Sequence, residues 1–155
     1  MENEIAQAET GDLGQLADLL AELFTLENDF RPDREKQLRG LHLILDNPAL
    51  GRLFVLRDRG RVAGMANLLF TVSTAEGSRV AVLEDVILRN EYRGKGLGRR
   101  LVEHVLAWAG RAGMARVTLL ADRDNKAALG FYRELGFDPS AMAVLRKRFL
   151  SHQNP

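Results

Sequence analysis

The residues that decide the fold read Arg89-Asn90-Glu91-Tyr92-Arg93-Gly94-Lys95-Gly96-Leu97-Gly98-Arg99-Arg100. They follow an apolar, β-branched run at 80–88, which is typical of a mostly buried strand. After them, apolar residues recur at helical spacing from Leu97 to Ala109. The sequence therefore predicts a strand that enters a glycine loop, and a helix that begins where the loop ends.

This loop has the chemistry of a phosphate site. Glycines at alternate positions (94, 96 and 98) allow positive φ and let a ligand approach the backbone closely. The start of the helix offers unpaired N–H groups and the positive end of a dipole, which together favour an anion. The twelve residues also contain five basic side chains and one acid. We expect a phosphate or pyrophosphate to bind here.

Two familiar phosphate motifs do not fit the loop. A P-loop ends in Gly-Lys followed by Ser or Thr, and no such ending is present. The dinucleotide fingerprint requires G-x-G-x-x-G, whereas Gly98 comes one residue too early for it. Because Asp122 could imitate the acidic ribose ligand of that fingerprint, a dinucleotide-binding domain remains an alternative. A shift of melting temperature with NAD(P) or with CoA would distinguish the two.

The pattern Arg93-x-x-Gly96-x-Gly98 resembles the pyrophosphate loop of the GNAT superfamily, the acyl-CoA-dependent N-acyltransferases. The resemblance continues in the preceding strand, at Glu84-Asp85-Val86-Ile87-Leu88. It extends to the segment 125–137, which contains Asn125, the pair Phe131-Tyr132 and the ending Leu135-Gly136-Phe137. The motifs cover residues 84–137 well and the rest of the chain in outline.

Hydrophobic periodicity and turn signals predict an order of strands and helices that matches the order in the GNAT fold. The expected strands are 5–8, 52–57, 62–72, 80–88, 117–121 and 142–149, and the expected helices are 13–24, a second one ending near 46, 97–111 and 125–135. The resemblance implies an α/β fold with a mixed, mostly antiparallel sheet of six to seven strands. It also implies helices on both faces and a splayed central strand pair. We expect one domain, residues 1–150, followed by a frayed tail at 151–155.

The resemblance also implies a binding site for acetyl-CoA as cosubstrate. The pantetheine arm would bond the backbone of the strand at Val86, Ile87 and Leu88. The pyrophosphate would lie on the loop, against Arg93, Gly94, Lys95, Gly96, Leu97, Gly98 and Arg99. Asn125, a good helix N-cap in its own right, and Tyr132 would lie near the pantetheine.

Acetyl transfer to a primary amine requires the neutral amine. With a pKa near 10.4, only about one lysine-like amine in a thousand is unprotonated at neutral pH. Glu84 or Asp85 could remove the proton, although neighbours in a strand point to opposite faces and at most one should face the acceptor. The resemblance implies that Tyr132 protonates the departing thiolate. The chain has no cysteine, so we expect transfer without an acyl-cysteine intermediate.

The acceptor is less well defined by the sequence. Residues 1–30 contain eight acids and no basic residue, which indicates either a solvated helix face or a region that attracts a cationic amine. In the GNAT fold the residues around the acceptor would include Phe24, Phe30, Ser73, Thr74 and Glu76. The alternative function is a GNAT-like module that binds acyl-CoA without turnover, as a sensor or interaction domain.

Composition limits the other possibilities. The 155 residues, 46% of them hydrophobic, suffice for one domain with a core and contain no apolar run that could span a bilayer. The N-terminus lacks the features of a signal peptide, so we expect a cytoplasmic protein. A net charge of +1 gives no nucleic-acid signal, and the three histidines show no metal-ligand spacing. As in many members of the superfamily, we expect a homodimer.

Overall fold

The computed structural model describes residues 3–27 and 31–150. The tail expected at 151–155 lies outside these residues, and so does Phe30. The strands are β1 (Asn3–Gln7), β2 (Gly51–Asp58), β3 (Arg61–Ser73), β4 (Ser78–Leu88) and β5 (Val117–Leu119). The α-helices are α1 (Leu13–Leu26), α2 (Arg34–Leu45), α3 (Leu97–Arg111) and α4 (Lys126–Glu134). Two short 3-10 turns, η1 (Thr10–Asp12) and η2 (Asn90–Tyr92), precede α1 and α3.

One sheet contains the strands in chain order, β1-β2-β3-β4-β5. Successive strands are antiparallel up to β4, and β5 runs parallel to β4. The hairpin from β2 to β3 turns at Arg59 and Gly60, which both have positive φ, as a two-residue loop matched to strand twist requires. The parallel pairing of β5 is possible because α3 carries the chain back along the sheet before β5 begins.

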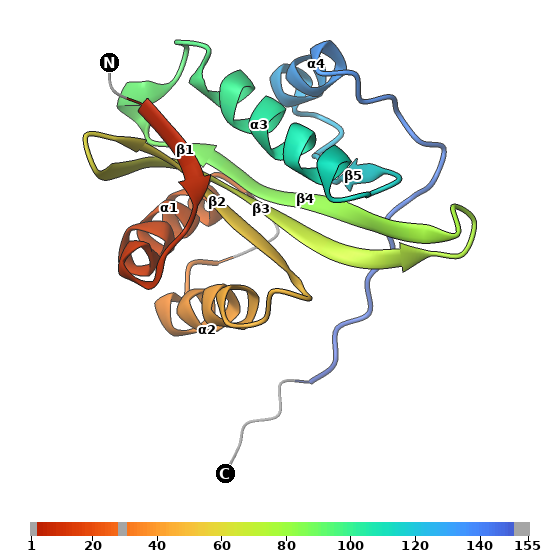
Figure 1. The fold of residues 1–155 in the computed structure, drawn as a ribbon, viewed down its shortest axis with the longest axis horizontal. Helices are drawn as coiled ribbons and strands as arrows, with labels where there is room; N and C mark the ends of the chain where they lie inside the picture. The colour runs from red at the N-terminus through yellow and green to blue at the C-terminus, as the bar shows by residue number, and fades with distance from the viewer. Residues whose placement is uncertain (1–2, 28–30, 151–155) are drawn as a thin grey trace.

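Helices cover both faces of the sheet, with α1 and α2 on one side and α3 and α4 on the other (Figure 1). Each side has its own apolar core, because each helix presents one apolar stripe to the strands. On the α1 side, leucines of α1 and α2 pack on strand residues: Leu16, Leu19, Leu41, Val55 and Met65. On the α3 side the packing involves Phe54, Leu68, Leu101, Val102 and Val105.

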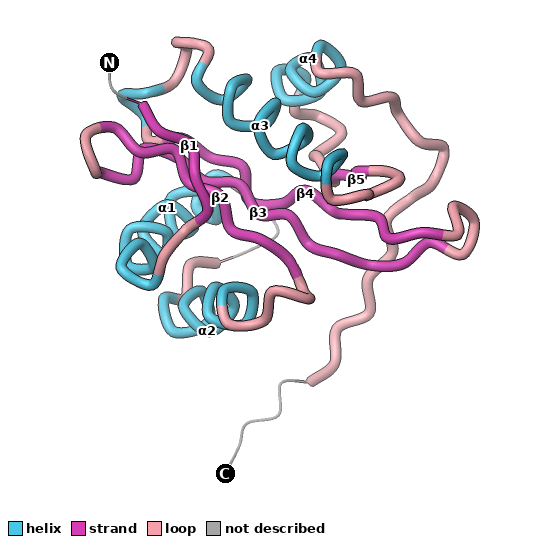
Figure 2. Tube along the Cα trace, in the orientation of Figure 1, coloured by secondary structure: helices cyan, strands magenta, loops and turns pink. Residues whose placement is uncertain are grey.

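The sheet has fewer strands than expected. The described residues form five strands, not six to seven, although the mixed pairing and the helices on both faces are confirmed. The missing strand is the segment 142–149, which is neither helix nor strand and leads away from α4 as a loop (Figure 2). Strand-forming side chains give a strand only where a neighbouring strand supplies backbone partners. In this structure the segment runs away from β5, which explains the difference.

Candidate active site

The glycine loop has the conformation that its sequence predicts. Gly94 and Gly96 have φ of 75° and 76°, in the left-handed region that favours glycine. A Cβ at either position would meet no atom within 4 Å, so the loop's outer surface is open. Gly98 differs, because a Cβ there would lie 3.6 Å from the Leu88 side chain. The first two glycines therefore serve the backbone conformation, whereas a Cβ at Gly98 would make only an ordinary van der Waals contact with β4.

The helix α3 begins at Leu97 directly after Gly96, and no side chain caps its first turn. Its first N–H groups are thus left for a ligand or for water. The side chains of Lys95, Arg99 and Arg100 add positive charge around this helix end. Arg99 is held by Glu103, with Nε donating to the carboxylate at 2.8 Å. The backbone and charge at this end suit a pyrophosphate.

Arg93 has a structural role beside any role in binding. Its Nε donates to the carbonyl oxygen of Leu88 at 3.0 Å, and its Nη2 donates to Glu22 at 2.9 Å. Through these bonds Arg93 joins the end of β4 to α1. Glu22 was not expected at the site, because only the fold brings residues that are 71 positions apart together.

The strands β4 and β5 are neighbours over only three residues. Ala81, Val82 and Leu83 pair with β5, and β4 then continues to Leu88 without a strand partner on that side within the described residues. The two strands therefore part after Leu83, as expected of a splayed pair, but the pair is not central, because β5 is the last described strand of the sheet. Val86 and Leu88 belong to the apolar cluster beside α3 and are only partly buried, together with Leu119 and Phe131. Backbone groups without a strand partner between partly exposed apolar side chains suit an extended, amide-containing ligand.

A bulge interrupts β4 at Asp85. The pairing with β3 shifts between Met65 and Asn67, so that Ala66 lies opposite two residues, Asp85 and Val86. Asp85 has φ of 54°, a conformation that Asp and Asn tolerate better than most other non-glycine residues. The strict alternation of side chains assumed from the sequence does not hold here.

The bulge places both acids of the Glu84-Asp85 pair on the same side of the sheet. Glu84 lies directly opposite Asn67, and cross-strand partners project from one face. The Asn67 Nδ2 in turn donates to Asp85 Oδ2 at 2.7 Å. This is the α1 face, because Met65, two residues before Asn67, packs in the core beneath α1. The two acids therefore do not point to opposite faces, as strict strand alternation would require.

Asp85 is the most perturbed acid of the site. Burial raises the pKa of its carboxyl to about 6, the negative charge of Glu84 adds to this, and the bond from Asn67 opposes it. Asn67 is 1% exposed, and its Oδ1 has no hydrogen-bond partner among the described residues. Sequence reasoning missed Asn67, although a lone amide in the apolar run 62–72 was a usable signal. Glu84 is exposed, so the two acids, which look alike in the sequence, differ in burial.

Tyr132 lies on α4 among aromatic rings. Its ring contacts Phe131 and Phe137 edge-on, with centroid distances of 5.0 and 5.7 Å. Burial raises the pKa of the Tyr132 hydroxyl to about 12, so the phenol keeps its proton at neutral pH. At the start of the same helix the Asn125 Oδ1 accepts from the Ala128 N–H at 3.1 Å, and the expected N-cap is confirmed.

Ion pairs account for several acids of the N-terminal region. Asp18 pairs with Arg34 at 2.7 Å, Glu22 with Arg93 at 2.9 Å, and Asp12 with Arg57 at 2.6 Å. These contacts leave less uncompensated negative charge than the sequence indicates. Near Asp85 the further acids are Glu84 and Glu27, both of which raise its pKa.

Three of the groups expected around the acceptor, Ser73, Thr74 and Glu76, do not lie near Asp85. Ser73 pairs with Ser78 at the far end of the β3–β4 hairpin, six positions along the ladder from Asn67. At about 3.3 Å per residue this is roughly 20 Å away. Glu76 lies in the same distant turn, where it pairs with Arg116 at 3.8 Å. Phe24, by contrast, packs on the core beneath α1.

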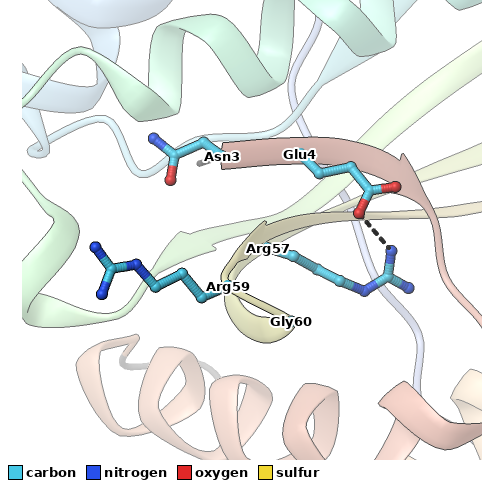
Figure 3. A pocket seen from close by; sticks show the side chains of 5 residues that line it. All are labelled: Asn3, Glu4, Arg57, Arg59 and Gly60. Atoms are coloured by element: carbon cyan, nitrogen blue, oxygen red, sulfur yellow. Dashed lines mark ion pairs between the residues drawn. The ribbon is translucent and has the colours of Figure 1, made fainter. Parts of the chain in front are cut away.

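A surface hollow elsewhere is a weaker candidate. It is lined by Asn3, Glu4, Arg57, Arg59 and Gly60, around the β2–β3 turn (Figure 3). It lies at the β1 side of the sheet, whereas the splayed strands lie at the β5 side. In residues 3–27 and 31–150, no three His, Asp or Glu side chains gather as metal ligands, and no helix has the length and apolar character of a membrane span.

The mixed sheet, the splayed strand pair and the glycine loop at the start of α3 define the class as an acetyltransferase-like α/β fold. Residues 15–137 match the Acetyltransferase (GNAT) family. Because the match spans most of the chain, the protein belongs to this family.

Relatives and solved structures agree with this assignment. The uncharacterized N-acetyltransferase YobR of Bacillus subtilis is 29% identical over 71% of this chain and 41% of its own length. Glucosamine 6-phosphate N-acetyltransferase of Trypanosoma brucei brucei is 34% identical over 56% of this chain and 57% of its own. The chain thus spans about half the length of the curated relatives it matches. A predicted acetyltransferase from Clostridium acetobutylicum, solved with acetyl-CoA, has the same fold: TM-score 0.76, 14% identity, 94% of this chain and 96% of that one.

Proposed function

We propose that this chain transfers the acetyl group of acetyl-CoA directly to a primary amine, with Asp85 as the base. The observation that carries the proposal is the position of Asp85. Its partly buried carboxyl, with a pKa of about 6, lies on a bulge at the point where β4 loses its β5 neighbour. Family membership supports the donor half of the reaction.

The donor site fits acetyl-CoA in three respects. Gly94 and Gly96 expose backbone at the start of α3, and no side chain of the described residues caps its first turn by a hydrogen bond. The end of β4, at Val86 to Leu88, has backbone groups that a pantetheine arm could bond. We therefore place the pyrophosphate at Gly94 to Arg99, with Asn125 and Tyr132 beside the pantetheine.

When bound, acetyl-CoA supplies a thioester whose carbon–sulfur bond breaks as the carbon–nitrogen bond of the product forms. Asp85 takes the proton that the ammonium form of the amine loses before attack and returns it to water; the second proton, which nitrogen loses as the amide forms, also passes to water. A carboxylate whose pKa has risen towards neutrality is a stronger base than an ordinary one and is still mostly ionised at pH 7. Asn67 positions this carboxylate by its 2.7 Å bond.

Tyr132 completes the proton balance. Its hydroxyl, with a pKa of about 12, is protonated at neutral pH and gives that proton to the departing thiolate sulfur. A thiolate with a pKa near 8.5 needs little help to leave, so the contribution is modest. The tyrosinate then regains its proton from water.

For the acceptor, we propose a small cationic amine. Glu84 and Glu27 add negative charge beside Asp85, which favours a cation close to the base. Asp12, Asp18 and Glu22 form ion pairs, so Glu84 beside Asp85, and not the whole N-terminal region, supports the proposal. A named relative acetylates an amino sugar phosphate, and this makes amino sugars one class to test.

The test is release of CoA thiol from acetyl-CoA by the purified protein with a panel of amines: polyamines, amino sugars, amino acids and a lysine peptide. We expect release above the blank without acceptor, and faster release with cationic amines than with neutral or anionic ones. Saturable acetyl-CoA binding without release for any amine would favour a sensor module. A preference for anionic amines would contradict the charge argument.

A further inference from the structure

Asn67 is the most deeply buried polar side chain that the structure describes, and half of its amide is unused. The residue is 1% exposed and lies in the middle of β3. Its Nδ2 donates to Asp85 Oδ2 at 2.7 Å, but its Oδ1 has no hydrogen-bond partner within residues 3–27 and 31–150. A buried acceptor without a partner is rare, because it has given up its bonds to water and has gained none in return.

The other two buried polar side chains of the described residues have no unused atom of this kind. Gln37 donates from Nε2 to a backbone carbonyl oxygen at 2.7 Å and accepts at Oε1 from a backbone N–H at 2.9 Å. Both carboxylate oxygens of Asp12 accept from the Arg57 guanidinium. The unused oxygen of Asn67 is therefore an exception, and it belongs to the one of these three side chains that is bonded to the proposed base.

The oxygen of Asn67 needs a donor, and the charged groups that act on Asp85 are both acids. They are Glu84 on β4 and Glu27 at the C-terminal end of α1. As carboxylates they accept hydrogen bonds and donate none. Asp85 itself gains an O–H when it is protonated, and it is already bonded to the same amide. Because burial raises the pKa of Asp85 to about 6, this protonated form is accessible near neutral pH.

We propose that Asn67 Oδ1 accepts a hydrogen bond from the carboxyl group of Asp85 once that carboxyl is protonated. An amide carries a donor and an acceptor side by side, and a protonated carboxyl carries the complementary pair. Asn67 thus donates to the ionised carboxylate, and it both donates to and accepts from the protonated carboxyl. It is a positioning residue that holds Asp85 in both of its protonation states.

The role of this bond in turnover rests on the proposed function, in which Asp85 is the base. When the ammonium N–H bond breaks, the proton forms an O–H bond on Asp85, and this O–H donates to Asn67 Oδ1. The same proton then passes to water, and the ionised carboxylate keeps the bond from Asn67 Nδ2. The carboxyl therefore stays in place on its bulge through the whole cycle.

Carbon-13 NMR of the Asn67 side-chain carbonyl tests the bond without any turnover. Between pH 8 and pH 4 we expect the Asn67 Cγ resonance to move downfield with the same midpoint as the Asp85 carboxyl carbon, because accepting a bond withdraws electron density from the carbonyl. The resonance is assigned by its loss in Asn67→Leu. In Asp85→Asn, the matched control, it should show no movement with that midpoint.

Two results of this titration would overturn the proposal. The first is an Asn67 resonance that does not move, as expected if an ordered water occupies Oδ1 at every pH. The second is an upfield movement, as expected if Nδ2 merely loses its charged acceptor and Oδ1 stays unpaired.

The pH dependence of kcat/KM tests the role in turnover. Asn67→Leu has a similar volume and removes the bond that opposes the rise in the Asp85 pKa, so the acidic limb of the profile should move to higher pH. The kcat should fall as well, because the base is no longer held. Gln37→Leu is the matched control, since it removes a buried amide that has no bond to Asp85 and should leave the limb in place.

An acidic limb that stays in place in Asn67→Leu would refute the positioning role. If no amine is turned over by the unmodified protein, the proposed function fails, whereas the NMR titration still decides whether the bond forms.

Discussion

At the scale of single residues, the proposed reaction depends most on Asp85. It combines a positive φ, a bulge, burial and a single strong bond from Asn67. Burial disfavours the ionised carboxylate and, with the charges of Glu84 and Glu27, raises its pKa to about 6, although the bond from Asn67 opposes this rise. Strain and burial of this kind cluster at functional sites.

One prediction follows for stability. The folded-state pKa of Asp85, about 6, exceeds the ordinary value of 3.8. The contribution of protonated Asp85 to the free energy of unfolding is therefore fully present below about pH 4. It is lost as the pH rises through about 6. Asp85→Asn stays neutral and tolerates the backbone conformation, so at pH 8 it should be more stable than the unmodified protein by roughly 2–3 kcal/mol.

Urea unfolding of both proteins at pH 4 and pH 8 measures this effect. The stability difference between them should be small at pH 4 and large at pH 8. Glu35→Gln serves as the control, because Glu35 is exposed on α2 and is not among the charges that act on Asp85. Equal differences at the two pH values would mean that the Asp85 carboxyl is not perturbed.

A second prediction concerns Tyr132. Removing the hydroxyl in Tyr132→Phe leaves the ring contacts with Phe131 and Phe137 in place, so the fold should not change. We expect a modest fall in kcat, on the order of tenfold, with little change in acetyl-CoA binding by calorimetry. An unchanged kcat would show that the Tyr132 hydroxyl does not protonate the departing thiolate.

At the scale of elements, the turn from β4 into α3 was predictable and the bulge was not. Glycines, basic residues and the change from strand to helix periodicity are local signals within 80–109, and the structure confirms them. The bulge at Asp85 depends on pairing with β3, which no pattern within β4 reveals. The contacts of Arg93 with Glu22 and of Asp85 with Asn67 were unpredictable for the same reason.

Gly96 provides a test at this scale. A Cβ there meets no atom, so Gly96→Ala acts through backbone strain alone, about 1–2 kcal/mol at φ of 76°. Relief of that strain would turn the first N–H groups of α3 away from the ligand. We expect weaker acetyl-CoA binding by calorimetry.

Gly110 in the same helix is the matched control. It also has open space around it, but it lies within the helix, where alanine is favoured by up to about 1 kcal/mol. Gly110→Ala should therefore raise the melting temperature and leave acetyl-CoA binding unchanged. If both variants bind acetyl-CoA like the unmodified protein, the loop is not its site.

At the scale of the whole molecule, the sequence predicts the α/β architecture but overestimates the number of strands in one chain. The segment 142–149 has the composition of a strand, and composition does not say where the partner strand lies. The same limit applies to the acceptor site. The walls of the acceptor site that we propose around Asp85 come from α1, β3 and β4, and only the folded chain shows that Ser73 and Glu76 are distant from Asp85.

The most direct test of the central claim is steady-state CoA-thiol release by the unmodified protein and Asp85→Asn, with acetyl-CoA binding measured in parallel. With the best amine of the panel, we predict saturable turnover by the unmodified protein. For Asp85→Asn we predict a kcat lower by about 10²–10⁴ and equal acetyl-CoA affinity. Equal turnover by the two proteins would show that Asp85 is not the base. Acetyl-CoA binding without turnover of any amine would contradict the proposed enzyme itself.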